Sequence, residues 1–341
     1  MDLVVGVDAG GTASRAVVAT VDGSVVGRGV AGPGNPLSGG VSAASAVGAA
    51  LVDALSGCDP SLVAGGVLGL AGTSAVADPV IAGAFDAMWR SLGLNCPMRI
   101  VGDVVTAFAA GTPAPSGAVL IAGTGAVAAR IVDHAVVAVA DGFGWLLGDE
   151  GSGRWMGLQA LRSAVRDWPS TLALLVAAHA RVTSADALIR WAQALPFAAI
   201  DDLAPVVCNA ARNGDASAGL IVSEAATRLL ATLDQVVAAA PTGPPSPVSA
   251  RPSPALASPA SAPALTRPSL PASAPTPTRP VVLAGGLLAG DTPVREAVAE
   301  TLRKRGTTVG TSRDPAAAAA WLAARPLSGS GAPALHAALL G

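Results

Sequence analysis

Three glycine-rich turns, each beside a strand-like run, carry the residues best suited to chemistry. The first turn follows a β-branched run that ends at Asp8, and it contains Gly10, Gly11 and Thr12. Glycines let backbone N–H groups approach an anion closely, a threonine hydroxyl adds a donor, and a carboxylate can hold a hydrated Mg²⁺. This turn therefore predicts a phosphate-binding hairpin with Asp8 as a metal ligand, and a plain Gly-Gly hairpin is the alternative.

The other two turns repeat this design farther along the chain. Gly123, Thr124 and Gly125 separate two strand-like runs, and Gly285-Gly286 follows a third. We interpret the strand, Gly-Thr-Gly turn and strand as the start of a second copy of one α/β unit, with one phosphate-binding hairpin from each copy. For Gly285-Gly286 the alternative is tight strand–helix packing alone.

Acidic residues lie next to these turns. Asp103 ends a short strand, where its carboxylate could act as the general base for an alcohol, an effect worth roughly 10²–10⁴ in rate. It could instead cap the helix that begins at Val104. The stretch 141–153 contains five glycines and three carboxylates, which predicts a functional loop. Within it, Asp149 and Glu150 could also be solvated loop acids.

The elements that must position these residues alternate between strands and helices, which predicts an α/β fold. Strands are expected at 4–7, 15–18, 24–30, 64–70, 98–101, 118–122, 126–132, 280–283 and 307–309. Helices are expected at 41–57, 78–92, from 104, over most of 154–239, from 292 and at 315–324. With 341 residues, the chain is long enough for two lobes.

Composition excludes several function classes. The net charge of −2 and the pI near 5.9 give no electrostatic footprint for nucleic acid. The single lysine, Lys304, lies outside any G-x-x-x-x-G-K-[ST] pattern, so a Walker P-loop is excluded. The cysteines and histidines are few and scattered, which disfavours a metal cage built on them. We expect a cytoplasmic protein without a signal peptide or a membrane span.

Residues 241–280 are rich in Pro, Ser and Ala and have no repeat period. Such a segment cannot bury a core, so we expect a disordered insertion within the second lobe.

Five segments in order resemble the acetate and sugar kinase, Hsp70 and actin superfamily: DAGGT, GD at a strand end, GTG, DEGSG and AGG. More specific pieces are Gly34-Asn35-Pro36, Leu70-Ala71-Gly72 and Gly214-Asp215-Ala216. With these, the chain resembles the N-acetylglucosamine and glucosamine kinases of the BadF/BadG/BcrA/BcrD-type ATPase family over all but the proline-rich insertion.

The resemblance implies two RNase-H-like lobes, as in actin-like ATPases, with ATP and a sugar in the cleft between them. The lobes would be 1–112 and 113–325, and a tail or helix at 326–341 would pack back on the first lobe. A homodimer is a further expectation.

The resemblance also implies a role for each matched residue. Asp8 would order Mg²⁺ through water, and Asp103 would be the catalytic base for the sugar 6-hydroxyl. ATP would contact Gly10, Gly11, Thr12, Gly123, Thr124, Gly125, Gly214, Ala216, Gly285 and Gly286. The sugar would contact Asn35, Asp103, Gly142, Gly144, Trp145 and Asp149. Asn35 also suits a turn and Trp145 could simply pack its loop. Animal members carry a bulky aromatic residue where this chain has Pro36-Leu37.

The implied activity is ATP-dependent phosphorylation of an amino sugar, with N-acetylglucosamine first and glucosamine second. A cationic glucosamine would favour a carboxylate near its nitrogen, and Asp141, Asp149 and Glu150 are the candidates. A less favoured alternative is an ATP-driven activator of a 2-hydroxyacyl-CoA dehydratase, which needs clustered thiolates for an iron–sulfur centre.

Overall fold

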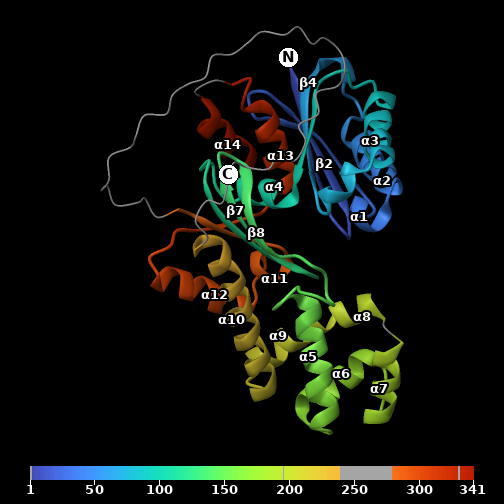
Figure 1. The fold of residues 1–341 in the computed structure, drawn as a ribbon, viewed down its shortest axis with the longest axis vertical. Coiled ribbons are helices and arrows are strands. Elements are labelled where there is room, and N and C mark those ends of the chain that lie inside the picture. The colour runs from blue at the N-terminus through green and yellow to red at the C-terminus, as the bar shows by residue number, and fades with distance from the viewer. Residues whose placement is uncertain (1, 195, 239–278, 329–330) are drawn as a thin grey trace.

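The structure is a computed structural model, and it describes residues 2–194, 196–238, 279–328 and 331–341 (Figure 1). Its framework is two five-stranded sheets with the strand orders β3-β2-β1-β4-β5 and β10-β9-β6-β7-β8. In each sheet the first three strands in sequence pair antiparallel, each with the next. The fourth strand pairs in parallel with the first, and the fifth pairs in parallel with the fourth. The second sheet, read in reverse, therefore repeats the first strand by strand, which confirms the predicted duplication at the level of topology.

The described strands are β1 Leu3–Ala9, β2 Ser14–Thr20, β3 Val25–Ala31, β4 Val63–Leu70, β5 Met98–Gly102, β6 Gly117–Ala122, β7 Ala126–Val132, β8 Ala135–Asp141, β9 Val281–Ala284 and β10 Val309–Thr311. The described α-helices are α1 Pro36–Gly39, α2 Ser42–Ala54, α3 Pro79–Ser91, α4 Asp103–Ala109, α5 Gly153–Arg166, α6 Thr171–Ala180, α7 Ala185–Gln193, α8 Phe197–Asp201, α9 Leu203–Arg212, α10 Ala216–Ala238, α11 Gly286–Ala289, α12 Pro293–Lys304, α13 Pro315–Ala324 and α14 Ala332–Leu340.

The first sheet has helices on both faces. Alternate residues of β1 point to opposite faces, so Val5 and Val7 pack with α2 and α3, while Val4 packs with α4 and α13. A Cβ at Gly6 would lie only 2.1 Å from the backbone nitrogen of Ala320. Gly6 therefore lets α13 lie directly on the strand, at a distance that no side chain allows.

The helices α4 and α13 lie between the two sheets. One buried cluster contains Val4 and Val67 of the first sheet, Val119 and Val282 of the second, and the side chains of both helices. Figure 1 shows α13 and α14, in red, beside the blue strands of the first lobe. The helix α13 falls within the segment 113–325 that was expected to form the second lobe, and it contacts β1, β2 and β4 of the first sheet. Its run of buried alanines is thin enough to fit between the sheets.

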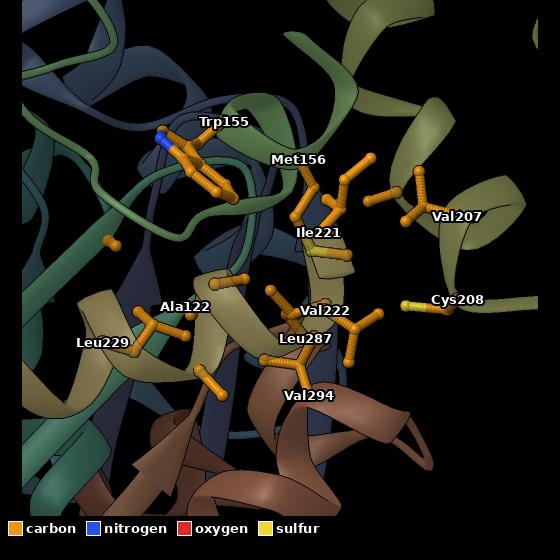
Figure 2. Packing of buried hydrophobic residues seen from close by; sticks show 14 of the residues in the cluster. Ala122, Trp155, Met156, Val207, Cys208, Ile221, Val222, Leu229, Leu287 and Val294 are labelled. Carbon is orange, nitrogen blue, oxygen red and sulfur yellow. The ribbon is translucent and has the colours of Figure 1, made fainter. Parts of the chain in front are cut away.

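The second sheet is covered by a large helical layer. The side chains of α5, α9, α10, α11 and α12 meet in one cluster, which includes Trp155, Met156, Ile221 and Leu287 (Figure 2). The helical character expected for 154–239 is confirmed for its described residues, and the expected helix 315–324 matches α13. The expected strand at 307–309 is shifted to Val309–Thr311, and β8 was not expected.

No single helix of the described residues is long and apolar enough to cross a membrane, although the bent pair α6–α7 meets the criteria of length and composition. The predicted insertion 241–280 lies outside the described residues, except for its last two residues.

Candidate functional site

Two carboxylates meet at the carboxyl edge of the first sheet. The strands β1, β4 and β5 are parallel neighbours, and their register places Asp8 beside Gly69 and Gly69 beside Val101. Asp103 follows β5 directly as the first residue of α4, and both acids are half-buried. The topology therefore brings together the two acids that sequence reasoning assigned to the metal and to the base.

The environment of these acids favours their protonated forms. Burial, with the nearby charge of Asp103, raises the pKa of Asp8 to about 7, while Arg15 acts in the opposite direction. Burial also raises the pKa of Asp103, against a hydrogen bond from the Val104 N–H. Two carboxylates this close resist carrying two charges together, so the pair is a natural place for a proton or a cation.

Thr106 and Gly69 support this pair, and sequence reasoning missed both. The buried Thr106 hydroxyl donates to the Asp103 carbonyl oxygen at 2.9 Å and also contacts the Asp8 side chain. A Cβ at Gly69 would lie 2.4 Å from the Thr106 Oγ1, so a glycine is needed there. Two signals were available: a glycine inside a strand, and a threonine one helical turn after Asp103.

The alternative reading of Asp103 as a helix cap is only partly supported. The N-cap residue of α4 is Gly102, which makes no side-chain cap. The Asp103 Oδ1 accepts a hydrogen bond from the next N–H, that of Val104, at 2.9 Å. A standard cap is made by the side chain of the N-cap residue, and Asp103 is already the first residue of the helix, so its bond to the neighbouring N–H is not a standard cap.

The first glycine turn closes the β1–β2 hairpin, as expected. Its Gly10 N–H donates to the Ala13 carbonyl oxygen at 3.0 Å, so the N–H groups of Gly11 and Thr12 are those it can offer to a phosphate. Among the described residues, nothing lies within 4 Å of a Cβ built on Gly10 or Gly11. The turn is therefore unobstructed around the Cβ positions of both glycines.

The second turn lies against the start of α5 and the third turn. The Gly153 N–H donates to the Gly123 carbonyl oxygen at 2.7 Å, and the Arg154 N–H to that of Thr124 at 3.4 Å. Asp149 accepts from the Ala126 N–H at 3.0 Å. A Cβ at Gly285 would lie 2.4 Å from the Ala122 carbonyl oxygen, which supports tight packing there.

Gly286 lies close to the second turn and remains open. A Cβ at Gly123 would lie 3.7 Å from the Gly286 nitrogen, whereas a Cβ at Gly286 would meet nothing within 4 Å among the described residues. Gly214, at φ +87°, is equally open and precedes Ala216 at the start of α10. The ion pair of Arg212 with Asp291, at 2.8 Å, joins this region to the segment after α11. This ion pair therefore connects the two segments that carry the expected ATP contacts Gly214 and Ala216 on one side and Gly285 and Gly286 on the other.

Asp141 holds the loop that carries the expected sugar contacts. Its carboxylate accepts hydrogen bonds from the N–H groups of Gly142 at 2.8 Å, Asp149 at 2.7 Å and Glu150 at 2.9 Å. The loop is closed at its base in this way, and it exposes Gly142, Gly144 and the apolar residues between and after them. Asp141 thus stabilises the conformation of the loop, and its role as a partner for an ammonium group is not supported.

Other side chains of this region are also engaged. Glu150 forms an ion pair with Arg228 of α10. Trp145 packs on Phe197 of α8, with ring centroids 5.3 Å apart, and remains 37% exposed. Arg154 lies over the Phe197 ring. The Asp149 Oδ1 accepts the hydrogen bond from the Ala126 N–H, and burial raises the pKa of this carboxyl group.

Asn35 is a cap and also faces the residues that follow β4. Its Oδ1 accepts from the Leu37 N–H at 2.8 Å, which confirms the turn-forming alternative. A Cβ at Gly72 would lie 2.3 Å from that oxygen, and Gly72 adopts φ +69°. The Asn35 amide nitrogen is therefore the group that could donate to a sugar, and Leu37 beside it is 68% exposed.

The donor set fits a hydrated Mg²⁺ better than a caged metal. No group of three or more His, Cys, Asp or Glu side chains suited to a metal occurs among the residues that the structure describes. Mg²⁺ usually keeps several waters and uses one or two carboxylates together with substrate phosphates. The Asp8–Asp103 pair beside an open glycine turn matches that requirement.

The sequence model of the BadF/BadG/BcrA/BcrD ATPase family matches residues 5–250. The N-acetylmuramic acid/N-acetylglucosamine kinase of Clostridium acetobutylicum is 29% identical over 171 residues, which are 49% of this chain and 55% of that protein. This chain therefore spans about half the length of the curated relative that it matches.

Two solved structures share the fold. A candidate N-acetylglucosamine kinase from Chromobacterium violaceum superposes with a TM-score of 0.69 at 24% identity, covering 94% of this chain and 99% of that one. Another from Porphyromonas gingivalis gives a TM-score of 0.65 at 20% identity, covering 91% of this chain and 94% of that one. At these identities the likeness establishes the fold, which is the expected two-lobed, actin-like ATPase fold.

Proposed function

Because this chain belongs to the BadF/BadG/BcrA/BcrD ATPase family, we propose that it is an ATP-dependent sugar kinase that phosphorylates the 6-hydroxyl of an amino sugar. The observation that carries the proposal is the pair Asp8 and Asp103 at one sheet edge, next to an open Gly-Gly-Thr turn. The topologically equivalent turn of the second sheet would provide a second set of N–H donors.

Asp103 is the proposed base. Its carboxylate takes the proton of the 6-hydroxyl while that oxygen attacks the γ-phosphorus and the bond to the leaving ADP oxygen breaks. The raised pKa of Asp103 brings it nearer to neutral pH, where a base is most effective. Thr106 positions Asp103 through its bond to the Asp103 carbonyl oxygen.

The two glycine turns stabilise charge. The N–H groups of Gly11 and Thr12, and those of Thr124 and Gly125, would face the β- and γ-phosphates. Phosphoryl transfer depends mainly on positioning and electrostatic stabilisation, which such donors supply. Asp8 would hold Mg²⁺, which neutralises phosphate charge when bound. Gly214, Ala216, Gly285 and Gly286 would contact the adenosine.

N-acetylglucosamine is the proposed first substrate and glucosamine the second. Of the three carboxylates that could meet an ammonium group, Asp141 is bound by three N–H groups and Glu150 by Arg228. Asp149 accepts a single backbone N–H, that of Ala126, and forms no ion pair among the described residues, so it is the carboxylate best placed to meet an ammonium group. The exposed Gly142–Gly144 backbone beside Trp145 offers donors and an apolar wall, which suit an acetamido group. Asn35 would bind a sugar hydroxyl.

A coupled ADP-release assay tests the proposal. We expect kcat/KM to be highest for N-acetylglucosamine, lower for glucosamine, and lower again for N-acetylmannosamine and glucose. A higher kcat/KM for glucose than for either amino sugar would contradict the amino-sugar assignment. Absence of ADP release with every sugar would contradict the kinase.

An ATP-driven dehydratase activator is the second candidate, because the family includes ATPases of other kinds. It would need an iron–sulfur cluster. Cys208 is buried in the second lobe, while Cys58 and Cys96 pack against the core of the first. Iron analysis of the purified protein separates the two functions: iron in stoichiometric amount would favour the activator.

A further inference from the structure

A cavity of about 260 Å³ lies in the second lobe, away from the residues discussed above. Gly117, Ala118 and Val281 line it, and these residues begin β6 and β9. The glycine turns 123–125 and 285–286 follow the opposite ends of the same strands. At about 3.3 Å per residue, the six-residue β6 separates the cavity from the second turn by roughly 20 Å.

The wall of the cavity combines an apolar floor with a charged rim. Leu302 of α12 contributes to the floor, and the rim holds Arg130, Arg279, Arg305 and Asp234. The helices α10 and α12, which lie side by side, provide Asp234 and Leu302 (Figure 1). Three guanidinium groups and one carboxylate give the rim a net charge of +2.

From this arrangement we propose that the cavity binds a small phosphate monoester at a site separate from the catalytic cleft. A phosphate monoester carries close to two negative charges near neutral pH, which matches the charge of the rim. Guanidinium groups bind phosphate oxygens in a bidentate manner, and the apolar floor suits a short carbon chain. Sites for drug-sized ligands occupy roughly 300–1,000 Å³, so this cavity fits a small metabolite and not a nucleotide.

Asp234 allows a test in which a substitution should strengthen anion binding. It accepts hydrogen bonds from Arg305 at 2.7 and 3.3 Å and so competes with a bound anion for the same guanidinium group. This ion pair is half-exposed, so its loss costs little stability. Replacing Asp234 with Asn removes one negative charge and releases Arg305. A purely structural role of the ion pair would not improve anion binding when the pair is broken.

Isothermal titration calorimetry with glycerol 3-phosphate measures this binding in the full chain. The protein is first saturated with Mg²⁺ and a non-hydrolysable ATP analogue, so that the cleft does not contribute. We expect one equivalent to bind the wild type, and glycerol not to bind. Arg279→Ala and Arg305→Ala should each weaken binding about tenfold, as expected for loss of one charge-assisted hydrogen bond. Asp234→Asn should tighten it.

Arg303→Ala is the matched control. Arg303 lies on α12 two residues before Arg305, is exposed, and does not line the cavity. Its replacement removes the same charge from the same surface, and we expect unchanged affinity. Absence of wild-type binding, equal binding of glycerol, equal weakening by Arg303→Ala, or weaker binding by Asp234→Asn would each overturn the proposal.

Discussion

Asp103 lies close enough to Asp8 for its charge to help raise the pKa of Asp8 to about 7. The two acids are 95 positions apart in sequence, and they meet because β1 and β5 flank β4 in one parallel set. The unfavourable proximity of like charges is typical of a site that performs chemistry.

The metal-free protein should lose stability as the pH rises towards neutrality. Between pH 4 and 7 the folded Asp8 retains a proton that the unfolded chain, with its ordinary pKa of 3.8, has lost. The free energy of unfolding therefore falls across this window, on the order of 1–3 kcal/mol for this group. Asp8→Asn should remove that part of the dependence. Urea unfolding in the presence of a chelator at several pH values measures the free energy of unfolding. If this free energy changes with pH in the same way for the wild type and for Asp8→Asn, Asp8 does not cause the dependence.

Asp103→Asn should lower kcat at least about 100-fold, because the amide cannot accept the hydroxyl proton. Binding of the sugar, measured by calorimetry, should persist. The control is Asp78→Asn, since Asp78 also stands at a helix start and accepts from the Val80 N–H at 2.8 Å. That variant should retain its kcat. If Asp103→Asn keeps more than about a tenth of the wild-type turnover, Asp103 is not the base.

Gly11→Ala separates phosphate binding from hairpin formation. Nothing among the described residues lies within 4 Å of the new methyl group, and Gly11 does not adopt a positive φ, so Tm should stay unchanged. The KM for ATP should rise about tenfold, because the methyl group holds a phosphate away from the N–H donors. Gly83→Ala, in the equally open surface of α3, is the control with unchanged KM. An unchanged KM for Gly11→Ala would favour a plain hairpin.

Gly69→Ala should displace Thr106 and, through it, the two acids. The new Cβ would lie 2.4 Å from the Thr106 Oγ1, and overpacking of this kind costs about 1–3 kcal/mol. We expect lower Tm and lower kcat together. Gly65→Ala in the same strand is matched, because its Cβ would lie 4.0 Å from the nearest atom. Equal effects of the two substitutions on kcat would argue against a positioning role for Thr106.

Asp141→Asn should loosen the loop 142–150 by weakening three N–H bonds. The KM for the sugar should rise about tenfold while the KM for ATP stays nearly constant. Asp133→Asn is the control, since Asp133 also has a positive φ, at 51° against 64° for Asp141, but lies in the β7–β8 turn. Steady-state kinetics with each substrate varied in turn shows the difference. A rise of both constants would indicate a general loss of folding instead.

The local signals were sufficient for many elements. The β-branched run 4–7 lies inside β1, and Asp78 caps α3 as expected. The expected helix 315–324 matches α13 at both ends. The local sequence of a helix or strand does not show which other element it packs against. Since every residue from Ala316 to Leu322 is buried, α13 has no polar face to indicate the sheet on which it packs. Local sequence does not show the strand order either, and the proximity of Asp8 to Asp103 depends on that order.

The residues of the candidate site also differed in how well the sequence predicted their roles. Glycine turns are visible in sequence because their composition is unusual. Asp141 was considered as a ligand for an ammonium group, because the sequence does not show that three N–H groups already bind its carboxylate. Thr106 was missed because its function depends on Gly69, which belongs to a different element.

The close contact of Gly6 with Ala320 has a consequence for biosynthesis. The first strand emerges early from the ribosome, whereas the helix that covers one of its faces is translated more than three hundred residues later. Until then, Val4 and Val67 have no helix α13 to bury them. The first lobe therefore cannot mature independently during translation, and it depends on a contact of very large sequence separation, which slows folding. Truncation before Pro315 would damage the lobe that begins the chain.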